Sequence, residues 1–248
     1  VIQEVGLYNA INTSLGYQEI TRKDMLKAMD AINQKLGFQV NILGDFGDEM
    51  GANVAESALL VKNFGFSADA AASLFMESVK MGKPLKEMTK EIMGQLAFQG
   101  TQDGIMVDMV KTIERATKIS GNLRANFGDN VGAIANAVYQ ADKLGLSLEG
   151  MEGASSNLLD FQSSIENEMK AELLLGRNLN LEKAREYALM GQTGKLMKEI
   201  SKQAGTQKDF LAMNIPQRKA LAKAVGLEVN ELADMFSKQK KMDALRKK

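Results

Sequence analysis

The 248-residue chain contains no cysteine, no histidine and no tryptophan. Without cysteine it can form neither disulfides nor thiolate metal sites. Without histidine it lacks the usual general base and the commonest transition-metal ligand, which excludes Ser-His, Cys-His and His-metal catalysis within the chain. Aromatic residues make up only 6%, which disfavours a sugar-binding cleft or a base-stacking platform. We therefore expect no enzyme, no catalytic residue, no cofactor and no metal.

Net charge and long apolar runs are also missing. The 31 basic residues balance the 31 acidic ones, so the whole chain is not strongly attracted to nucleic acid. The most apolar windows, Gly51–Val61 and Val131–Ala141, are far shorter than the roughly 20 residues that a membrane-spanning helix needs. The N-terminus lacks the basic and apolar regions of a signal peptide. It begins with Val1, as if inside a helix, and we expect a piece of a longer chain.

The residues that are abundant favour helices. Alanine, leucine, methionine, lysine and glutamate dominate, and only two prolines occur, Pro84 and Pro216, each where a helix could begin. The sequence predicts an all-α fold in which glycines end the helices. The expected helices lie near 1–14, 22–36, 47–63, 67–81, 84–98, 102–120, 122–144, 147–175, 180–190, 193–204, 207–213, 216–225 and 229–246.

Three short segments around a glycine, called glycine corners below, have similar sequences. They are FGFSAD at 64–69, LGLSLE at 144–149 and VGLEVN at 225–230. A left-handed glycine closes each preceding helix, and the apolar residue after it is expected to pack back on that helix. The corners lie 80 and 81 residues apart, counted from Gly65 to Gly145 and from there to Gly226. A duplicated helical unit and a chance recurrence of a favourable corner both explain this spacing.

Two expected helices carry an apolar stripe with three- and four-residue spacing. We divide the chain into a helical region at 1–145, rich in small residues, and a second helical region at 146–248. Each stripe must be covered by a neighbouring helix or by a partner chain. The first stripe holds Ile105, Met106, Met109, Val110, Ile113, Ala116 and Ile119. The second stripe lies on the longest amphipathic helix, 147–175, and holds Leu158, Phe161, Ile165, Met169, Leu173 and Leu174.

The segment 217–236 has the outline of a helix-turn-helix. A DNA-reading helix needs Arg, Asn or Gln at its exposed start. Here the second helix opens with acidic residues and one asparagine: Glu228, Asn230, Glu231 and Asp234. We therefore favour an ordinary helical hairpin. The closing run KQKKMDALRKK is either a solvated helix end or a surface for an acidic partner or anionic lipid.

Carboxylate pairs give no stronger sign of chemistry. Glu166 and Glu168 point in different directions on a helix, and Glu149 and Glu152 have no tryptophan or tyrosine cluster beside them to hold a sugar. The segments DFGDE at 45–49 and NFGDN at 126–130 lack the alternating ligands of a calcium loop. The sixteen methionines suit either ordinary core filling or a segment that repacks between two states.

The region 143–235 resembles the helical region of phage tail tape-measure proteins. The resemblance rests on LLDFQSSIENEMKAELLLG, NLNLEKAREYALMG and FLAMNIPQRKALAKAVGLEVNEL. That family spans the lumen of a viral tail, sets the tail length during assembly and leaves ahead of the DNA. The resemblance implies a structural protein of the virion, made in the host cytoplasm. It carries over no functional residue, since the family's task needs no catalytic constellation.

Combined with the many glycine corners, the resemblance predicts a folded portion at the tail tip or baseplate hub, and not the extended ruler. We expect several copies, three around the tail axis, to pair their apolar stripes as in a coiled coil. The other expected partners are tail-tip, hub and tail-tube proteins and, on ejection, the host membrane, with no specific nucleic-acid sequence. Two alternatives are a helix-turn-helix nucleic-acid-binding protein and a membrane-active protein acting through Ala52–Val61 or Val131–Val138.

Overall fold

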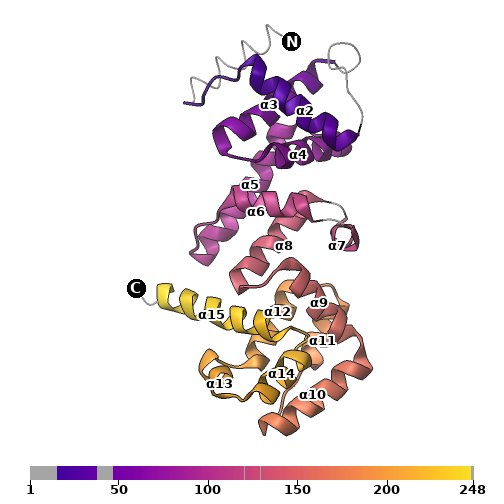
Figure 1. Ribbon diagram of the computed structural model, residues 1–248, viewed down its shortest axis with the longest axis vertical. Coiled ribbons are helices and arrows are strands. Elements are labelled where there is room, and N and C mark those ends of the chain that lie inside the picture. Colours follow the sequence, from indigo (N-terminus) through magenta and orange to yellow (C-terminus); the bar gives the residue numbers. More distant parts are fainter. Residues whose placement is uncertain (1–15, 38–46, 120, 129, 247–248) are drawn as a thin grey trace. The chain divides into compact units, whose positions relative to one another are not determined.

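The computed structural model describes residues 16–37, 47–119, 121–128 and 130–246, and these residues form helices and no strand (Figure 1). The predicted all-α fold is confirmed; the expected helix at 1–14 lies outside the described residues. Within the described residues, the helices up to residue 144 are α2 (Arg22–Leu36), α3 (Gly47–Phe64), α4 (Ala68–Met81), α5 (Leu85–Asp103), α6 (Met109–Lys118), α7 (Gly121–Asn126) and α8 (Val131–Leu144). The others are α9 (Leu148–Leu159), α10 (Phe161–Leu175), α11 (Glu182–Leu189), α12 (Thr193–Ala204), α13 (Gln207–Ala212), α14 (Ile215–Ala224) and α15 (Val229–Arg246).

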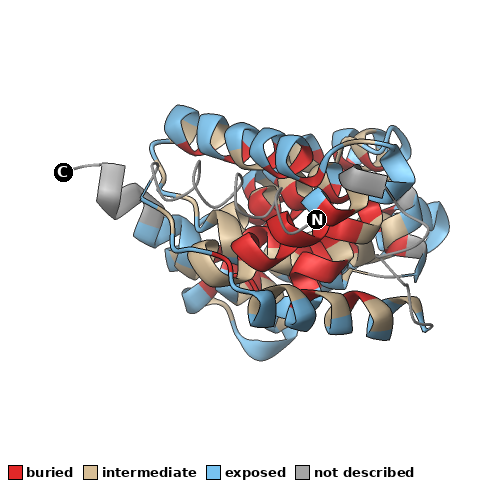
Figure 2. Cartoon of the chain, turned by 90° about the horizontal axis from the view of Figure 1, so that it is seen from above, coloured by how far each residue is buried: buried red, intermediate tan, exposed pale blue. Residues whose placement is uncertain are grey.

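The chain divides into two compact units, residues 1–136 and 137–248, and the division falls inside α8. In unit 1, α2, α3 and α4 pack on one another, and α5 and α6 pack on α4. In unit 2, α9 packs on α10, α11 and α12, while α14 packs on α10 and α15. Buried residues line the inward faces of the helices and exposed residues the outward faces (Figure 2).

Side chains cap helices close to three of the helix starts that the sequence predicts, near residues 22, 67 and 147. The Thr21 hydroxyl and the Asp24 carboxylate form a reciprocal capping box at the start of α2. Ser67 accepts the backbone N–H of Ala70 at α4, and Ser147 caps α9 in the same way. These short oxygen side chains satisfy backbone donors that the first helical turn leaves without partners.

The three shared corners are built as the sequence predicts. Gly65, Gly145 and Gly226 have φ values of 80°, 77° and 78°, which a side chain would oppose. The residues that follow them, Phe66, Leu146 and Leu227, are all buried, and each donates its N–H back to a carbonyl of the preceding helix. Such corners turn the chain within a few residues and keep the helices short.

The helix expected at 102–120 begins later than predicted, at Met109. Helix α5 continues to Asp103, and the Thr101 hydroxyl bonds within it to the Ala97 carbonyl at 2.9 Å. Left-handed Gly104 ends α5, and Asp108 caps α6 through the N–H of Lys111. The first apolar stripe is therefore interrupted: Ile113 and Ala116 are buried on α6, but Met106, outside any helix, is exposed.

The expected helix at 122–144 is also divided. Gly128 takes a left-handed φ of 61° after α7, and the Asn130 side chain then caps α8 by accepting the N–H of Ala133 at 2.9 Å. The two most apolar windows lie in α3 and α8, where most of their large side chains are buried. No helix of the described chain is long and apolar enough to cross a membrane.

The continuous helix predicted at 147–175 is broken at Asp160. This residue ends α9 and begins α10, with a ψ of 81° that no α-helix contains. Its carboxylate accepts the backbone N–H of Ser163 and, at 2.7 Å, the Ser163 hydroxyl. The side chain thus supplies an N-cap where the hydrophobic pattern alone predicts uninterrupted helix.

Candidate functional site

Helix α10 exposes its apolar residues to solvent. Phe161, Ile165, Met169 and Leu173 follow one another at four-residue intervals and have exposed fractions of 48%, 46%, 63% and 85%. We call these four residues the α10 ridge. Leu158, which the sequence places on the same stripe, is only 1% exposed because it lies on α9, before the break. A neighbouring helix of unit 2 therefore covers only the first member of the predicted stripe.

An adjoining side of α10 buries polar groups. Ser164, Glu168 and Ala171 are its buried residues. One Glu168 oxygen pairs with the Arg185 guanidinium at 2.7 Å, and the other accepts the backbone N–H of Leu181 at 2.8 Å. Arg185 also donates to the Ser164 hydroxyl at 3.0 Å. Every polar group of this network has a partner, so α10 is held by directed bonds with its apolar ridge outward.

The segment that follows α10 is fastened on both sides. Glu172 accepts the backbone N–H of Leu179 at 2.8 Å. Arg177 donates to the carbonyls of Gln203 and Ala204 at the end of α12, at 2.9 and 3.0 Å. These contacts satisfy terminal carbonyls of a helix and fix the turn between α10 and α11. A rotation of α10 that buried its ridge would have to break them.

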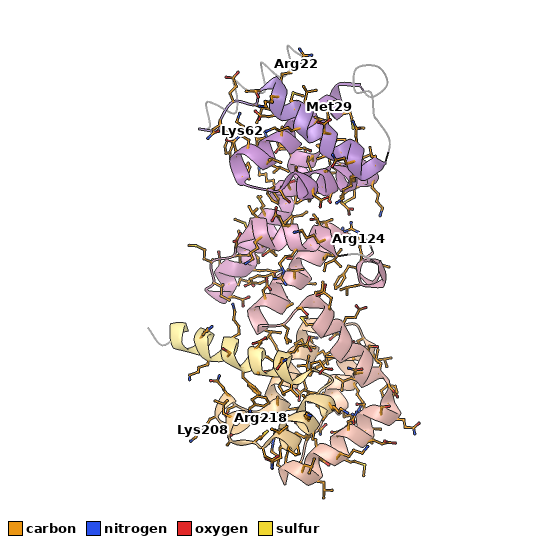
Figure 3. All side chains as sticks on the ribbon, in the orientation of Figure 1. Arg22, Met29, Lys62, Arg124, Lys208 and Arg218 are labelled. Atoms are coloured by element: carbon orange, nitrogen blue, oxygen red, sulfur yellow. The ribbon has the colours of Figure 1, made fainter. Side chains whose placement is uncertain are left out.

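Further apolar residues gather at the C-terminal end of α10. The Gln217 amide, in the first turn of α14, donates to the Leu174 carbonyl at 2.9 Å, and α14 lies beside α10 (Figure 1). Leu174 and Ile215 are both exposed. Arg218, labelled on α14 in Figure 3, donates to the carbonyls of Phe210 and Leu211 at the end of α13. The apolar surface thus continues from α10 onto the start of α14.

The segment 217–236 forms a helical hairpin of α14 and α15, as favoured from the sequence, and its turn packs against α9. Asn157 donates its amide to the Gly226 carbonyl at 3.0 Å, and a Cβ on Gly226 would meet the Ala154 carbonyl oxygen at 2.8 Å. At the start of α15, Glu231 caps the helix by accepting the N–H of Glu228, and it lies against Gly150. The start of this second helix is therefore engaged inside unit 2.

The basic chain end and the carboxylate pairs lie in different surroundings. Lys238, Lys240 and Lys241 are exposed on α15, while the side chains after them lie outside the described residues. Glu168 is buried in the network, whereas Glu166 is exposed and pairs with Lys170 at 3.6 Å. Glu149 and Glu152 lie on α9.

A groove of about 550 Å³ crosses the surface of unit 1. Two of its cationic lining residues, Lys35 and Arg124, have acidic partners. Lys35 pairs with Asp69 at 2.6 Å, and Arg124, labelled in Figure 3, pairs with buried Glu77 at 3.1 Å. Glu77 also accepts the backbone N–H of Val131 at 3.4 Å. These paired charges join helices of unit 1 to one another.

Unit 1 also buries one carboxyl without a complete set of partners. Glu56 on α3 is 6% exposed, and its Oε2 atom has no hydrogen-bond partner. Burial raises the pKa of this carboxyl, and the nearby charge of Lys86 opposes that shift. The group lies among helices and not beside the groove described above. We assign it a cost to stability and no chemical role.

No metal-ligand cluster of three or more carboxylates occurs in the described part of the chain. The acidic segment 45–49 lies outside it, apart from the backbone of residues 47–49 in α3. In the 126–130 segment, Gly128 makes the turn and the Asn130 side chain serves as a helix cap. The chain matches no protein-family model, no curated protein and no solved structure.

Proposed function

We propose that the chain is a segment of a viral tail tape-measure protein that helps to build the tail tip or baseplate hub. The observation that carries the proposal is the α10 ridge. A folded helical unit holds four large apolar side chains outward through a satisfied polar network. Exposed apolar surface of this kind is typical of a protein-binding site. The region whose sequence resembles tape-measure proteins includes this same helix.

The helix lengths support a hub position over the extended ruler. The longest described helix is α5, with 19 residues, which span only about 28 Å at about 1.5 Å per residue. Glycine corners fold the following helices back within each unit. A ruler must keep its helices in line along the tube. This segment instead offers a folded body with a surface for partners.

In this proposal the chain has no catalytic role and acts inside the virion. Its partners are further copies of itself, three around the tail axis in the arrangement expected from the sequence, together with hub and tail-tube proteins. The absence of cysteine leaves no disulfide to prevent unfolding when the protein leaves ahead of the DNA. The host membrane is its proposed contact after ejection.

The test is tail assembly with an in-frame deletion of residues 51–82, viewed by electron microscopy. This deletion removes most of α3 and all of α4, and with them much of the unit 1 core. The proposal predicts absent or misassembled tails, because the hub would not form. A second particle carrying Leu173→Glu is expected to show the same defect with unit 1 intact. Leu26→Glu, an exposed position on α2, serves as the matched control.

Two other outcomes would overturn parts of the proposal. Uniform tails shortened by roughly 48 Å, which is 32 residues at about 1.5 Å each, would make the segment part of the ruler. Normal, infective tails of unchanged length would remove the tape-measure assignment. Neither the helix-turn-helix nor the membrane alternative gains a specific observation, since the α14–α15 corner is engaged inside unit 2 and most large side chains of the two apolar windows are buried.

A further inference from the structure

The zero net charge of the chain conceals a strongly basic end. Residues 193–248 hold 13 lysines and arginines against 6 aspartates and glutamates, whereas residues 1–192 hold 18 against 25. We infer that α12 and α15 of unit 2 carry a lysine surface that binds the phosphate backbone of double-stranded nucleic acid without reading its sequence. The inference goes beyond the proposed function, because this binding holds whether or not the chain works in a tail.

Three lysines lie on the outward side of α12. The buried residues of this helix are Leu196, Met197, Ile200, Ser201 and Ala204. Lys195, Lys198 and Lys202 follow one another three and four residues apart and are all exposed. This spacing places them on one side of the helix, away from the buried residues. They span roughly 10 Å along α12, at about 1.5 Å per residue.

The end of α15 brings three more lysines to the same part of unit 2. The Gln239 amide donates to the Ser201 hydroxyl at 2.8 Å, which joins α15 to α12. Lys238, Lys240 and Lys241 lie within two residues of Gln239 and are all exposed. We call these three lysines and the three of α12 the lysine surface.

Little negative charge opposes the lysine surface. Lys202 pairs with Glu199 at 3.5 Å, within α12. The other five lysines have no ion-pair partner in the described part of the chain. On α15, Glu231 serves as a helix cap, which leaves Asp234 as the exposed acidic side chain among those described on that helix. The surface therefore carries a net positive charge that attracts a polyanion.

The residue types favour phosphate over an acidic protein. Arginine, whose planar group matches a carboxylate with two parallel hydrogen bonds, occurs once among the described side chains of α12–α15. That residue, Arg218, is already bound to the carbonyls of Phe210 and Leu211. Protein-binding surfaces are rich in aromatic residues and arginine and poor in lysine. Lysine binds phosphate as a point charge, and nucleic-acid-binding surfaces are far more positive than protein-binding ones.

The burial pattern disfavours an anionic membrane and a single strand. An interfacial helix inserts its apolar side into lipid, but the apolar side of α12 is buried in the core of unit 2. A single strand stacks its bases on aromatic rings. Phe210 and Phe236, which belong to this part of unit 2, are only 3% and 1% exposed and pack on each other. The phosphates of a double helix need neither an inserted apolar side nor a stacking platform.

This contact differs from the helix-turn-helix considered from the sequence. There the start of α15 would enter the major groove, but that start is acidic, and Glu231 lies against Gly150 inside unit 2. The lysines lie at the other end of α15 and on α12. Contacts to phosphate alone carry no sequence information, so the affinity should be the same for unrelated sequences.

Fluorescence anisotropy of a labelled DNA duplex, titrated with the full 248-residue chain, tests the inference. With about four phosphate contacts, the dissociation constant should be roughly 1–10 µM at about 50 mM salt and rise roughly 100-fold at about 200 mM, because bound counterions are released. Two duplexes of unrelated sequence should bind equally well. A single strand of the same length should bind more weakly and with a smaller salt dependence.

A matched pair of double variants locates the contact. Lys198→Gln with Lys241→Gln removes two charges from the lysine surface and keeps good helix formers. It should weaken binding at least roughly tenfold at about 50 mM salt and reduce the slope of log affinity against log salt by about two. Lys23→Gln with Lys27→Gln makes the same change at exposed positions of α2 and should leave affinity and slope unchanged.

Three outcomes would overturn the inference. The duplex could stay unbound at about 50 mM salt with roughly 100 µM protein. The α2 variant could weaken binding as much as the variant of the lysine surface, which would make the attraction a property of the whole chain. Finally, phosphatidylserine vesicles or polyglutamate could bind as tightly as the duplex at the same salt. The partner would then be a membrane or an acidic protein.

Discussion

Two buried glutamates, one in each unit, have opposite surroundings. Glu168 in unit 2 is 8% exposed, yet both of its oxygens have partners, the Arg185 guanidinium and the Leu181 backbone N–H. Glu56 in unit 1 is 6% exposed, and one of its oxygens has none. Burial fraction alone does not distinguish them. The difference lies in the groups that replace the lost water.

The comparison shows what the polar network does for α10. A fully partnered carboxylate fixes the rotation of its helix, because each bond requires one direction. That rotation leaves Ser164 inside and the apolar ridge outside. A carboxylate without a complete set of hydrogen-bond partners does not fix the rotation of its helix, and its burial lowers stability. In unit 2 the polar network therefore holds the apolar ridge outward, whereas in unit 1 Glu56 only lowers the stability of the fold.

The largest effect should come from Glu168→Ala. The substitution leaves Arg185 buried without its counter-charge, and removal of one partner from a buried ion pair typically costs about 3–5 kcal/mol. Urea unfolding followed by circular dichroism measures the loss. Glu166→Ala, two residues away on the exposed side, should change the unfolding free energy by less than about 0.5 kcal/mol. Equal effects of the two variants would contradict the network's role.

The next effect separates the two parts of the predicted stripe. Leu158→Ala removes a side chain that is 1% exposed and should cost about 2–4 kcal/mol, because it opens a cavity in the unit 2 core. Leu173→Ala, at an 85% exposed position, should stay within about 0.5 kcal/mol at concentrations where the chain is monomeric. A large loss from Leu173→Ala under those conditions would mean that unit 2 itself covers this residue.

Glu56→Gln should stabilise the chain by about 1 kcal/mol at pH 8, since it removes a poorly compensated buried charge. Burial raises the pKa of Glu56 above its ordinary 4.5 in the folded state. The stabilisation that its proton gives is complete below the unfolded pKa and is lost as the pH rises through the folded pKa. The advantage of the variant should therefore shrink on acidification. Unfolding titrations at pH 5 and pH 8 check the sign, and a loss at pH 8 would contradict it.

An effect of similar size but opposite sign concerns a partnered carboxylate at the surface of unit 1. Hydrogen bonds from Lys62, labelled in Figure 3, and from Thr21 hold the pKa of Asp24 well below its ordinary 3.8. Its contribution is present above the unfolded pKa and is lost as the pH falls through the lowered folded pKa. Asp24→Asn should cost about 1 kcal/mol at pH 7. Hydrogen exchange of the α2 amides measures the cost, and unchanged rates would contradict it.

Local side-chain chemistry made much of the fold predictable. Oxygen side chains at Thr21, Ser67 and Ser147 cap helices because their neighbours three residues on supply the N–H groups. Left-handed glycines at the shared corners end helices for a reason that is local to the backbone. Such signals depend on only a few adjacent residues. Their effect does not depend on the rest of the chain.

The sequence-based predictions were wrong or incomplete where two local signals competed, or where contacts between distant residues determined the structure. The hydrophobic pattern runs through Asp160 without interruption, but the carboxylate finds a better partner in Ser163 than the helix offers. The sequence also identified the residues of the α10 ridge but not their exposure. That depends on Arg185, which is distant in sequence from Ser164 and Glu168. A serine and a glutamate four residues apart beside the apolar stripe, Ser164 and Glu168, were the available signal.

The account's central claim is that the α10 ridge faces outward from unit 2, whereas Leu158, before the break at Asp160, is buried. Because the chain has no cysteine, single thiols can be introduced by Leu173→Cys and Leu158→Cys, and their rates of labelling measured against protein concentration. Below about 1 µM, where weak dimers dissociate, the thiol at position 173 should react like a free one and that at 158 only slowly. Protection of position 173 at every concentration, or of neither position, would contradict the account.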